Sequence, residues 1–199
     1  MSERSSYPTF DEFFERLEVR KVQTDLRDEL RSRVTRERGS VHRVGSEATV
    51  VAVASRILPG DVPPKALAVF LDQTFDKQMG RSDEKRGLMP RAELVPTGFR
   101  LIDEEAIRRH GTPFAELAPD RQDTLLGESE KGSLKGPEGF DSAAWFNRVR
   151  ESFLLAFGSD PRGMVQMGFP GPSYQPGHVW LDPGEVKART ARKRGYLEL

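Results

Sequence analysis

The chain has 199 residues, 36% of them hydrophobic, with 31 Lys and Arg balanced by 31 Asp and Glu and with no Cys. Proteins that bind the phosphate backbone of nucleic acids usually carry an excess of positive charge, whereas the formal net charge here is zero. We therefore expect no nucleic-acid partner. The absence of Cys excludes disulfides, thiolate metal sites and a thiol nucleophile, while twelve Phe and two Trp supply enough aromatic surface for an ordered core.

Membrane insertion and export are not indicated by the residues given. The strongest apolar window, residues 48–58, is interrupted by Ser55 and Arg56 and is far shorter than the roughly 20 residues that cross a bilayer. We therefore expect no transmembrane segment. The first residues, MSERSSYPTF, show no apolar signal core and no adjacent arginine pair. As written, the sequence predicts a cytoplasmic protein, and the alternative is a periplasmic one that is exported together with a partner.

A long amphipathic helix is expected near the N-terminus. No Pro or Gly interrupts residues 10–38, and apolar residues recur there at steps of three and four. Gly39 is expected to end this helix as its C-cap. The apolar stripe consists of Phe10, Phe13, Phe14, Leu17, Val19, Val22, Leu26, Leu30 and Val34.

The next part of the chain predicts two helices. The first begins at a Ser46 cap and stops just before Pro59, because proline disfavours helical geometry in the residue that precedes it. The β-branched residues at 50–53 leave a buried strand as the alternative. The second helix starts at Pro63 and Pro64, because prolines suit the first helical turn, and continues through Met79.

The middle of the chain predicts one long and one short helix. The long helix opens at Pro90, is bent or restarted at Pro96, and ends at His110 before Gly111. The short helix opens at Pro119, and residues 127–139 are expected to form a surface loop because Gly and charged residues dominate them. The buried side of the long helix is expected to carry Leu94, Phe99, Ile102, Ala106 and Ile107.

The last strong helix begins at an Asp141 or Ser142 cap and has the most aromatic face in the chain. Residues 158–183 are rich in Gly and Pro yet too apolar for a free tail, so we expect an irregular segment there. The fold class is therefore all-α, an irregular helical bundle with a long N-terminal helix and a Pro/Gly-rich C-terminal wrapping loop. The aromatic face consists of Trp145, Phe146, Val149, Phe153, Leu154 and Phe157.

Catalytic and cofactor-binding patterns are missing from the sequence. The three His residues, His42, His110 and His178, have no metal-ligand neighbour at the helical spacings, and His110 is expected to interact with a helix C-terminus. The spacing of Gly158 and Gly163 is not followed by the Lys of a phosphate-binding loop. Glu104 and Glu105 are expected on a solvated helix face. We therefore expect no catalytic, cofactor-binding or metal-binding residues in this chain alone.

Aromatic residues beside the stiff segment 167–172 are the strongest candidates for contact with another protein. Rings held on a Pro/Gly-rich loop lose little conformational entropy on docking, which suits interface anchors. The alternative is that this loop packs back over its own helices and closes the core. The residues expected to bind a partner are Trp145, Phe169, Pro170, Tyr174 and Trp180.

Several short segments in a fixed order carry a family resemblance. They are Ala54-Ser55-Arg56-Ile57-Leu58-Pro59, Ala68-Val69-Phe70-Leu71-Asp72, Leu101-Ile102-Asp103-Glu104-Glu105-Ala106 with His110-Gly111, Phe114-Ala115-Glu116-Leu117, Arg121-Gln122-Asp123-Thr124-Leu125-Leu126, Phe157-Gly158-Ser159-Asp160-Pro161 and Gly168-Phe169-Pro170-Gly171. Over about residues 46–180 the chain resembles the small, gamma-type subunit of gluconate 2-dehydrogenase, the subunit 3 family. The order and spacing of the segments carry this resemblance more than any single one.

The resemblance implies a non-catalytic subunit that binds a large FAD-dependent sugar or sugar-acid dehydrogenase of the glucose–methanol–choline type. Such a subunit assists the folding, stability or export of its partner. The FAD belongs to the partner, no cofactor is bound by this chain alone, and family complexes often pass electrons to a cytochrome c subunit. The implied organisation is an N-terminal helical arm at 1–45, the family-like domain at 46–180 and a basic tail at 181–199.

The sequence departs from the family pattern in two ways. The twin-arginine leader common in the family is missing from the residues given, and the Gly-Gly-Asn stretch usual before the Phe-Pro-Gly segment is replaced by a shorter loop.

Two rival functions stay open. A stand-alone enzyme would need a polar cluster that the sequence does not assemble. A helical scaffold for an unrelated partner, or for an anionic membrane surface, would use the basic residues between Lys187 and Arg194.

Overall fold

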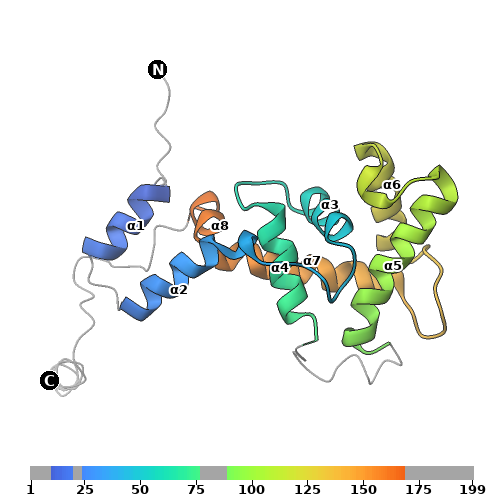
Figure 1. The fold of residues 1–199 in the computed structure, drawn as a ribbon, viewed down its shortest axis with the longest axis horizontal. Helices are drawn as coiled ribbons and strands as arrows, with labels where there is room; N and C mark the ends of the chain where they lie inside the picture. Colours follow the sequence, from blue (N-terminus) through green and yellow to red (C-terminus); the bar gives the residue numbers. More distant parts are fainter. Residues whose placement is uncertain (1–9, 20–23, 77–88, 169–199) are drawn as a thin grey trace, which may run out of the picture.

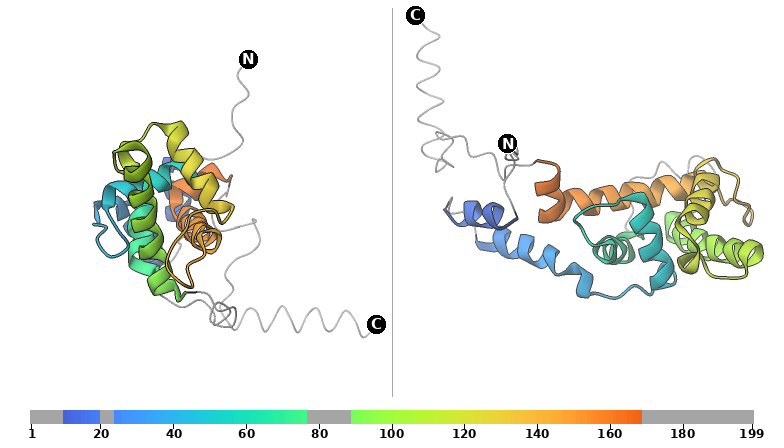
Figure 2. Two further views of the ribbon diagram at one scale, coloured as in Figure 1. Left: turned by 90° about the vertical axis from the view of Figure 1, so that its right-hand side faces the viewer. Right: turned by 90° about the horizontal axis from the view of Figure 1, so that it is seen from above.

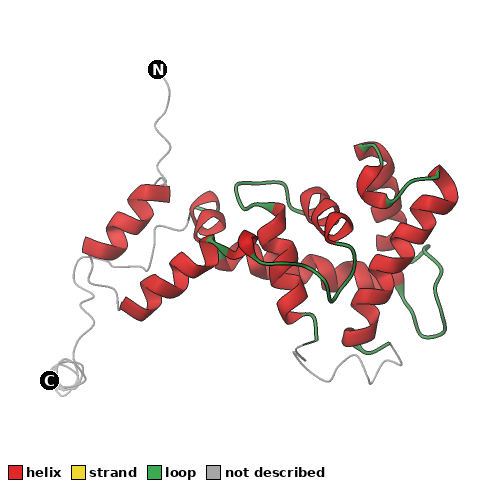
Figure 3. Ribbon diagram, in the orientation of Figure 1, coloured by secondary structure: helices red, strands yellow, loops and turns green. Residues whose placement is uncertain are grey.

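The computed structural model describes residues 10–19, 24–76 and 89–168. Within these ranges every regular element is helical and none is a strand (Figure 3), which confirms the predicted all-α class. The α-helices are α1 (Phe10–Val19), α2 (Thr24–Val34), α3 (Glu47–Ile57), α4 (Pro64–Thr74), α5 (Arg91–His110), α6 (Pro119–Glu130), α7 (Ser142–Ser159) and α8 (Pro161–Gln166). Two 3₁₀ turns, η1 (Arg36–Arg38) and η3 (Phe114–Glu116), lie between them.

Helix α7 runs through the middle of the molecule and supports most of the other helices (Figures 1 and 2). Helices α5 and α6 pack at the end where α7 begins, and α4 crosses its central part. The short helix α8 turns off the other end of α7, and α1 and α2 lie beyond it, which gives the described part an elongated outline (Figure 1).

The main hydrophobic core is shared by α3, α4, α5, α6 and α7. Its largest fully buried side chains include Trp145 and Phe153 from α7, Phe99 from α5 and Phe114 from η3. Val50 and Val53 are fully buried from α3, so the β-branched residues that left a strand open are helical. Packing of these side chains outweighs the weak β preference of the valines.

A second, smaller cluster joins α1 and α2 to α8. Phe13 and Leu30 are buried in it, and Phe14, Met164 and Val165 pack against them. This cluster is separate from the main core, so the N-terminal helices are attached to the body largely through α8.

The helix predicted over residues 10–38 is described as α1 and α2 on either side of residues 20–23, which lie outside the described residues. Its last turn differs from the prediction, because α2 stops at Val34 and the chain tightens into η1. The Ser32 and Thr35 hydroxyls donate to backbone carbonyls three residues earlier, which competes with regular α-helical bonding. Gly39 is the C-cap residue of η1, where the predicted helix was to end.

Several predicted helix ends are confirmed. Asp141 is the N-cap of α7, and its carboxylate accepts hydrogen bonds from the N–H groups of Ala143 and Ala144 at 2.8 and 3.2 Å. His110 is the last residue of α5, and Gly111 caps that helix with a left-handed φ of 77°. Ser46 occupies the N-cap position of α3 without a side-chain capping bond.

Two predicted loops contain regular helix. Helix α6 continues through Gly127 to Glu130, although residues 127–139 were expected to be a loop. Leu125, Leu126 and Ser129 are buried on α6, so packing outweighs the conformational cost of the glycine. Helix α8 lies inside the stretch expected to be irregular, because Asp160 caps it and Pro161 fits its first position.

Three further details of the helices differ from the sequence-based expectations. Pro96 lies inside a continuous α5, which therefore does not restart there. Ile107 was expected to be buried but is 51% exposed. Leu154 was assigned to the aromatic face of the last helix and is 50% exposed, whereas the other residues of that face are buried. Each helix carries more apolar residues than its neighbours can cover. Helix α4 ends at Thr74 with Phe75 as its C-cap residue, so it stops before the predicted end at Met79, which lies outside the described residues.

Among the described helices, none has both the length and the apolar character required to cross a bilayer. The proposed division of the chain at residues 45 and 180 stays a prediction.

Candidate functional site

Charged side chains tie α3 to α6. Arg56 on α3 donates through Nε to Asp123 Oδ1 on α6 at 2.7 Å, and its terminal nitrogen donates to the other carboxylate oxygen. The hydrogen bonds from Arg56 lower the pKa of the Asp123 carboxyl. Because this two-pronged contact occupies both oxygens, Asp123 joins two helices rather than presenting a free carboxylate to a ligand.

A second polar junction connects α3, α5, η3 and α6. The Asp103 carboxylate on α5 accepts a hydrogen bond from Thr49 Oγ1 at 2.7 Å and another from the Phe114 N–H at 2.9 Å. The Gln122 amide on α6 donates to the Phe114 carbonyl at 2.9 Å. The backbone of Phe114 is thereby held on both sides, which fixes its fully buried ring in the core.

Asp72 on α4 organises the segment before α3. It is 2% exposed, and its Oδ1 accepts hydrogen bonds from the consecutive N–H groups of His42, Arg43 and Val44 at 3.2, 2.7 and 3.0 Å. A concave run of backbone N–H groups is a typical anion-binding arrangement. In this protein the chain's own carboxylate fills it, so its role is structural.

A buried ionic cluster joins the N-terminal helices to the junction of α7 and α8. Asp160 is fully buried and accepts from the Arg162 N–H at 2.9 Å while its carboxylate pairs with the Arg162 guanidinium. The same guanidinium contacts Glu37 on η1 at 3.0 Å. Arg33 on α2 donates to the Ser159 carbonyl at 3.1 Å. These contacts hold α2 and η1 against the end of α7.

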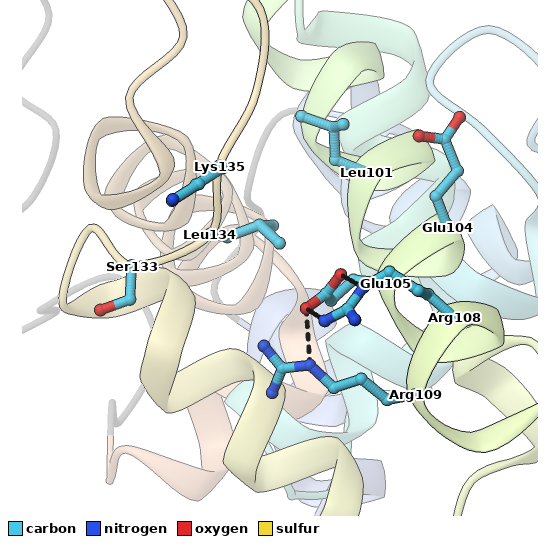
Figure 4. Close-up of a pocket in the computed structure, with 8 residues that line it drawn as sticks. All are labelled: Leu101, Glu104, Glu105, Arg108, Arg109, Ser133, Leu134 and Lys135. Carbon is cyan, nitrogen blue, oxygen red and sulfur yellow. Dashed lines mark hydrogen bonds and ion pairs between the residues drawn. The ribbon is translucent and has the colours of Figure 1, made fainter.

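A surface hollow of about 530 Å³ lies between α5 and the loop that follows α6 (Figure 4). Glu105 accepts hydrogen bonds from Arg108 at 2.7 Å and from Arg109 at 2.5 Å, and Arg109 also donates to Glu128 on α6 at 2.8 Å. The hollow is lined by Leu101, Glu104, Glu105, Arg108, Arg109, Ser133, Leu134 and Lys135.

The charges in this hollow compensate one another. Hydrogen bonds from Arg108, and then from Arg109, hold the pKa of Glu105 at about 2. Glu104 beside it pairs with Arg100 at 2.5 Å. Glu105 is therefore not the freely solvated carboxylate that the sequence suggested, and its strongly acidic pKa is unsuited to general acid–base work near neutral pH.

One Ser, His and Asp grouping superficially resembles a nucleophilic triad. The Ser40 Oγ lies 3.5 Å from His42 Nδ1, and Asp72 Oδ2 lies 3.9 Å from the same nitrogen. A triad needs the two ring nitrogens to serve different partners, so this geometry does not activate the serine. In the part of the chain that the structure describes, no group of three His, Asp or Glu side chains could hold a metal ion.

Trp145, expected to contact a partner, is a core residue in this structure. Its side chain has no exposed surface, and its Nε1 donates to the Val95 carbonyl at 3.1 Å. The ring packs edge-to-face on Phe99 with centroids 5.3 Å apart. A Cβ at Gly98 would overlap the indole, so α5 leaves room for it. Since a partner could reach this ring only by opening the core, we remove Trp145 from the expected contacts.

The other four expected contact residues, Phe169, Pro170, Tyr174 and Trp180, lie outside the described residues, so their roles stay predictions. His178 and the basic tail lie outside them too.

Sequence reasoning missed the exposed apolar residue Leu155 on α7. Met167, just after α8, is also exposed; it begins the segment 167–172 that the sequence singled out but was not named among the expected contacts. A signal was present, because residues 153–157 are all apolar and span more than one helical turn. Some of these side chains therefore had to face outward.

The family model described as gluconate 2-dehydrogenase subunit 3 matches residues 45–177. The chain belongs to this family. The match covers about two thirds of the chain and agrees with the resemblance over residues 46–180. No curated protein and no solved structure matches it. Helices α3 to α8 lie inside the matched region, whereas α1 and α2 precede it.

The segments that carry the family resemblance supply the polar junctions of this family member. Arg56 and Asp123 join two helices, Asp103 holds η3, Asp72 holds the segment before α3, and Asp160 caps α8. These side chains are therefore accounted for by the fold, and none of the five is left to form a reaction centre.

Proposed function

We propose that this chain is the non-catalytic small subunit of an FAD-dependent sugar or sugar-acid dehydrogenase of the glucose–methanol–choline type. In this role it binds the catalytic flavoprotein subunit and stabilises it. The FAD and the chemistry belong to the partner, and the electrons pass to a cytochrome c acceptor. The protein acts in the cytoplasm, or in the periplasm if it is exported with its partner.

The observation that carries the proposal is the family match over residues 45–177, because the family is described as one subunit of a dehydrogenase. The internal use of the family-like polar residues supports a binding role over a catalytic one. Asp72, Asp103 and Asp160 are each engaged by backbone N–H groups of this chain. A carboxylate occupied in this way serves poorly as a nucleophile or base.

The proposed partner contacts are Phe169, Pro170, Tyr174 and Trp180, on the segment that follows α8. Aromatic and proline side chains suit interface anchors because docking restricts few of their rotatable bonds.

Co-purification from the native host tests the function most directly. An affinity-tagged full-length chain should bring down one larger protein in a fixed ratio, and the complex should show the absorbance spectrum of an oxidised flavin. Mass spectrometry should identify that protein as a dehydrogenase of the proposed type. Sugar oxidation by the purified chain without any flavoprotein would show instead that it is an enzyme.

The contact residues are tested by replacing Phe169 and Trp180 with Ala in the tagged chain. We expect the flavoprotein to be lost from the purified complex while far-UV circular dichroism shows nearly unchanged helicity. Ile107→Ala, which shortens an exposed apolar side chain on α5, is the matched control and should retain the partner. An unchanged yield of complex from the double variant would place the interface elsewhere.

A further inference from the structure

Exposed apolar side chains gather where α7 ends. Among the described residues, the large hydrophobic side chains most exposed are Leu154 at 50%, Leu155 at 49%, Met167 at 58% and Ile107 at 51%. The first three lie close together, whereas Ile107 lies on α5. We call Leu154, Leu155 and Met167 the α7–α8 patch.

Gly158 explains why the three side chains of the α7–α8 patch are neighbours. It follows Leu154 by four residues and Leu155 by three, so it lies between them on the helix surface. The terminal Cε of Met167 lies 3.7 Å from where a Cβ of Gly158 would stand. The Met167 side chain therefore lies over the glycine, on the part of the helix surface that Leu154 and Leu155 flank.

The α7–α8 patch is not part of the chain's own hydrophobic core. The opposite side of α7 carries the buried residues Trp145, Val149, Phe153 and Phe157, which pack against α4, α5 and α6. Folding of the described part therefore does not need Leu154 or Leu155 to be apolar. Contiguous exposed apolar side chains on a soluble protein usually mark an interaction surface.

The ionic groups beside the patch are satisfied within the chain. Glu151, one turn before Leu154, pairs with Arg148 at 2.9 Å. Arg162 on α8 is shared between Asp160 and Glu37. An occupant of the patch therefore needs apolar or aromatic side chains and no compensating charge.

The patch alone is too small to hold a second copy of this chain in a stable dimer. Three half-exposed side chains offer on the order of 300 Å², against the roughly 800 Å² per partner that a stable interface buries. The patch must therefore be one part of a larger contact. Met167 is two residues from Phe169, at most about 7 Å along the backbone, so in the chain the patch directly precedes the contacts proposed above.

We propose that the α7–α8 patch is a docking site for the catalytic dehydrogenase subunit, which covers Leu154, Leu155 and Met167 with an apolar surface. This inference rests on the proposed function and adds to it a contact surface that lies within the described residues. It assigns the outer face at the end of α7 to the complex and leaves Ile107 on α5 outside it.

The absence of Cys from the chain permits a direct test of accessibility. Leu155→Cys and Ile107→Cys are made separately in the full-length chain, and the rate of maleimide labelling is followed by mass spectrometry. In the free chain both thiols should react rapidly. In the purified complex with the flavoprotein, labelling at position 155 should slow by at least about tenfold, while labelling at position 107 should keep its rate.

The affinity of patch variants for the flavoprotein provides a second test. Leu154→Glu should weaken the affinity for the purified flavoprotein by about thirtyfold or more in calorimetry, because it places a charge in an apolar contact. Ile107→Glu is the matched control, with the same kind of change at a similarly exposed helical position, and should bind like the unmodified chain. Circular dichroism and thermal unfolding verify that both variants are folded.

Three results would overturn the assignment of the patch. Slow labelling of Leu155→Cys in the free monomer would show that the chain covers its own patch. Slow labelling that appears only as the free chain dimerises would identify a second copy as the occupant. Equal affinity of Leu154→Glu and Ile107→Glu would place the docking site elsewhere. The affinity comparison presupposes that the unmodified chain forms the complex; if it does not, the proposed function itself fails.

Discussion

The polar residues at the helix junctions and the apolar residues of the α7–α8 patch reverse the usual distribution of residue types. Asp72 and Asp160 are buried at 2% and 0% exposure, whereas Leu154 and Met167 are exposed at 50% and 58%. The buried carboxylates have internal donors that account for their burial. Nothing in the described part of the chain covers the exposed leucine and methionine in the same way. The contrast shows that the buried carboxylates maintain the fold, and it is consistent with the binding role proposed above for the apolar surface.

The largest effect on stability is expected at the centre of the core. Trp145→Ala removes a fully buried indole and its hydrogen bond to Val95, and it should lower the free energy of unfolding by about 3–5 kcal/mol. Urea denaturation followed by far-UV circular dichroism measures this change. Trp145→Phe keeps most of the ring volume and should cost less. Full stability of Trp145→Ala combined with loss of the partner would show that Trp145 is an interface residue after all.

The buried carboxylate on α4 is expected to come next. Asp72→Ala leaves the N–H groups of His42, Arg43 and Val44 without their acceptor, and it should lower the free energy of unfolding by about 2–4 kcal/mol. Asp72→Asn can keep one oxygen in place and should lose about half as much. Hydrogen exchange at residues 42–44 should speed up in the Ala variant. Unchanged exchange there would mean that other contacts hold this segment.

The hollow beside α5 should contribute a smaller, pH-dependent effect. The pKa of Glu105 is lowered from the ordinary 4.5 to about 2, chiefly by hydrogen bonds from Arg108. A lowered folded-state pKa gives a stabilisation that is present above pH 4.5 and is lost as the pH falls toward 2. Glu105→Gln should therefore reduce the acid-dependent loss of unfolding free energy, by at most about 1 kcal/mol for a pair near the surface.

Thermal unfolding between pH 5 and pH 2 tests this window. Glu104→Gln is the control, because Glu104 lies beside Glu105 but is more exposed, at 55% against 17% of the side chain. It should leave the acid profile close to that of the unmodified chain. The same profile in all three proteins would show that the ion cluster contributes nothing to stability.

The smallest effect on stability is expected at the α7–α8 patch, where Leu154→Glu should change the free energy of unfolding by no more than about 0.5 kcal/mol. The leucine is half exposed, and glutamate has a good helix propensity. Urea denaturation of the isolated chain provides the measurement. A loss above about 2 kcal/mol would mean that the leucine supports the fold and that the contrast with Asp72 is false.

The regular parts of the fold were accessible from the sequence because local rules apply to them. Apolar periodicity placed α3, α5 and α7, and Asp141 and Gly111 were recognisable as helix ends. Local rules failed where packing opposed them. Gly127 was expected to begin a loop but lies inside α6, whose face is buried by Leu125 and Leu126.

The candidate site was much less accessible. Composition marks an aromatic residue as a possible anchor without showing whether its own chain covers it, and Trp145 was misassigned for this reason. Leu154 was assigned to the same aromatic face as Phe153 and Phe157, although the whole run 153–157 is apolar and cannot lie on one face. Which residues of such a run face outward depends on where α4 and α8 pack against the helix, and no local pattern encodes that.

The amino-acid sequence by itself determined that this protein is all-α, that it lacks cysteine chemistry, and that it belongs with the gluconate 2-dehydrogenase subunit 3 family. These properties depend on composition, on periodicity and on the order of short segments, all of which are linear. Only the tertiary structure decided that the charged residues of those segments face one another across helices, and that Leu154, Leu155 and Met167 face outward. Burial and pairing depend on contacts between residues far apart in the chain, which the periodicity of a single helix does not specify.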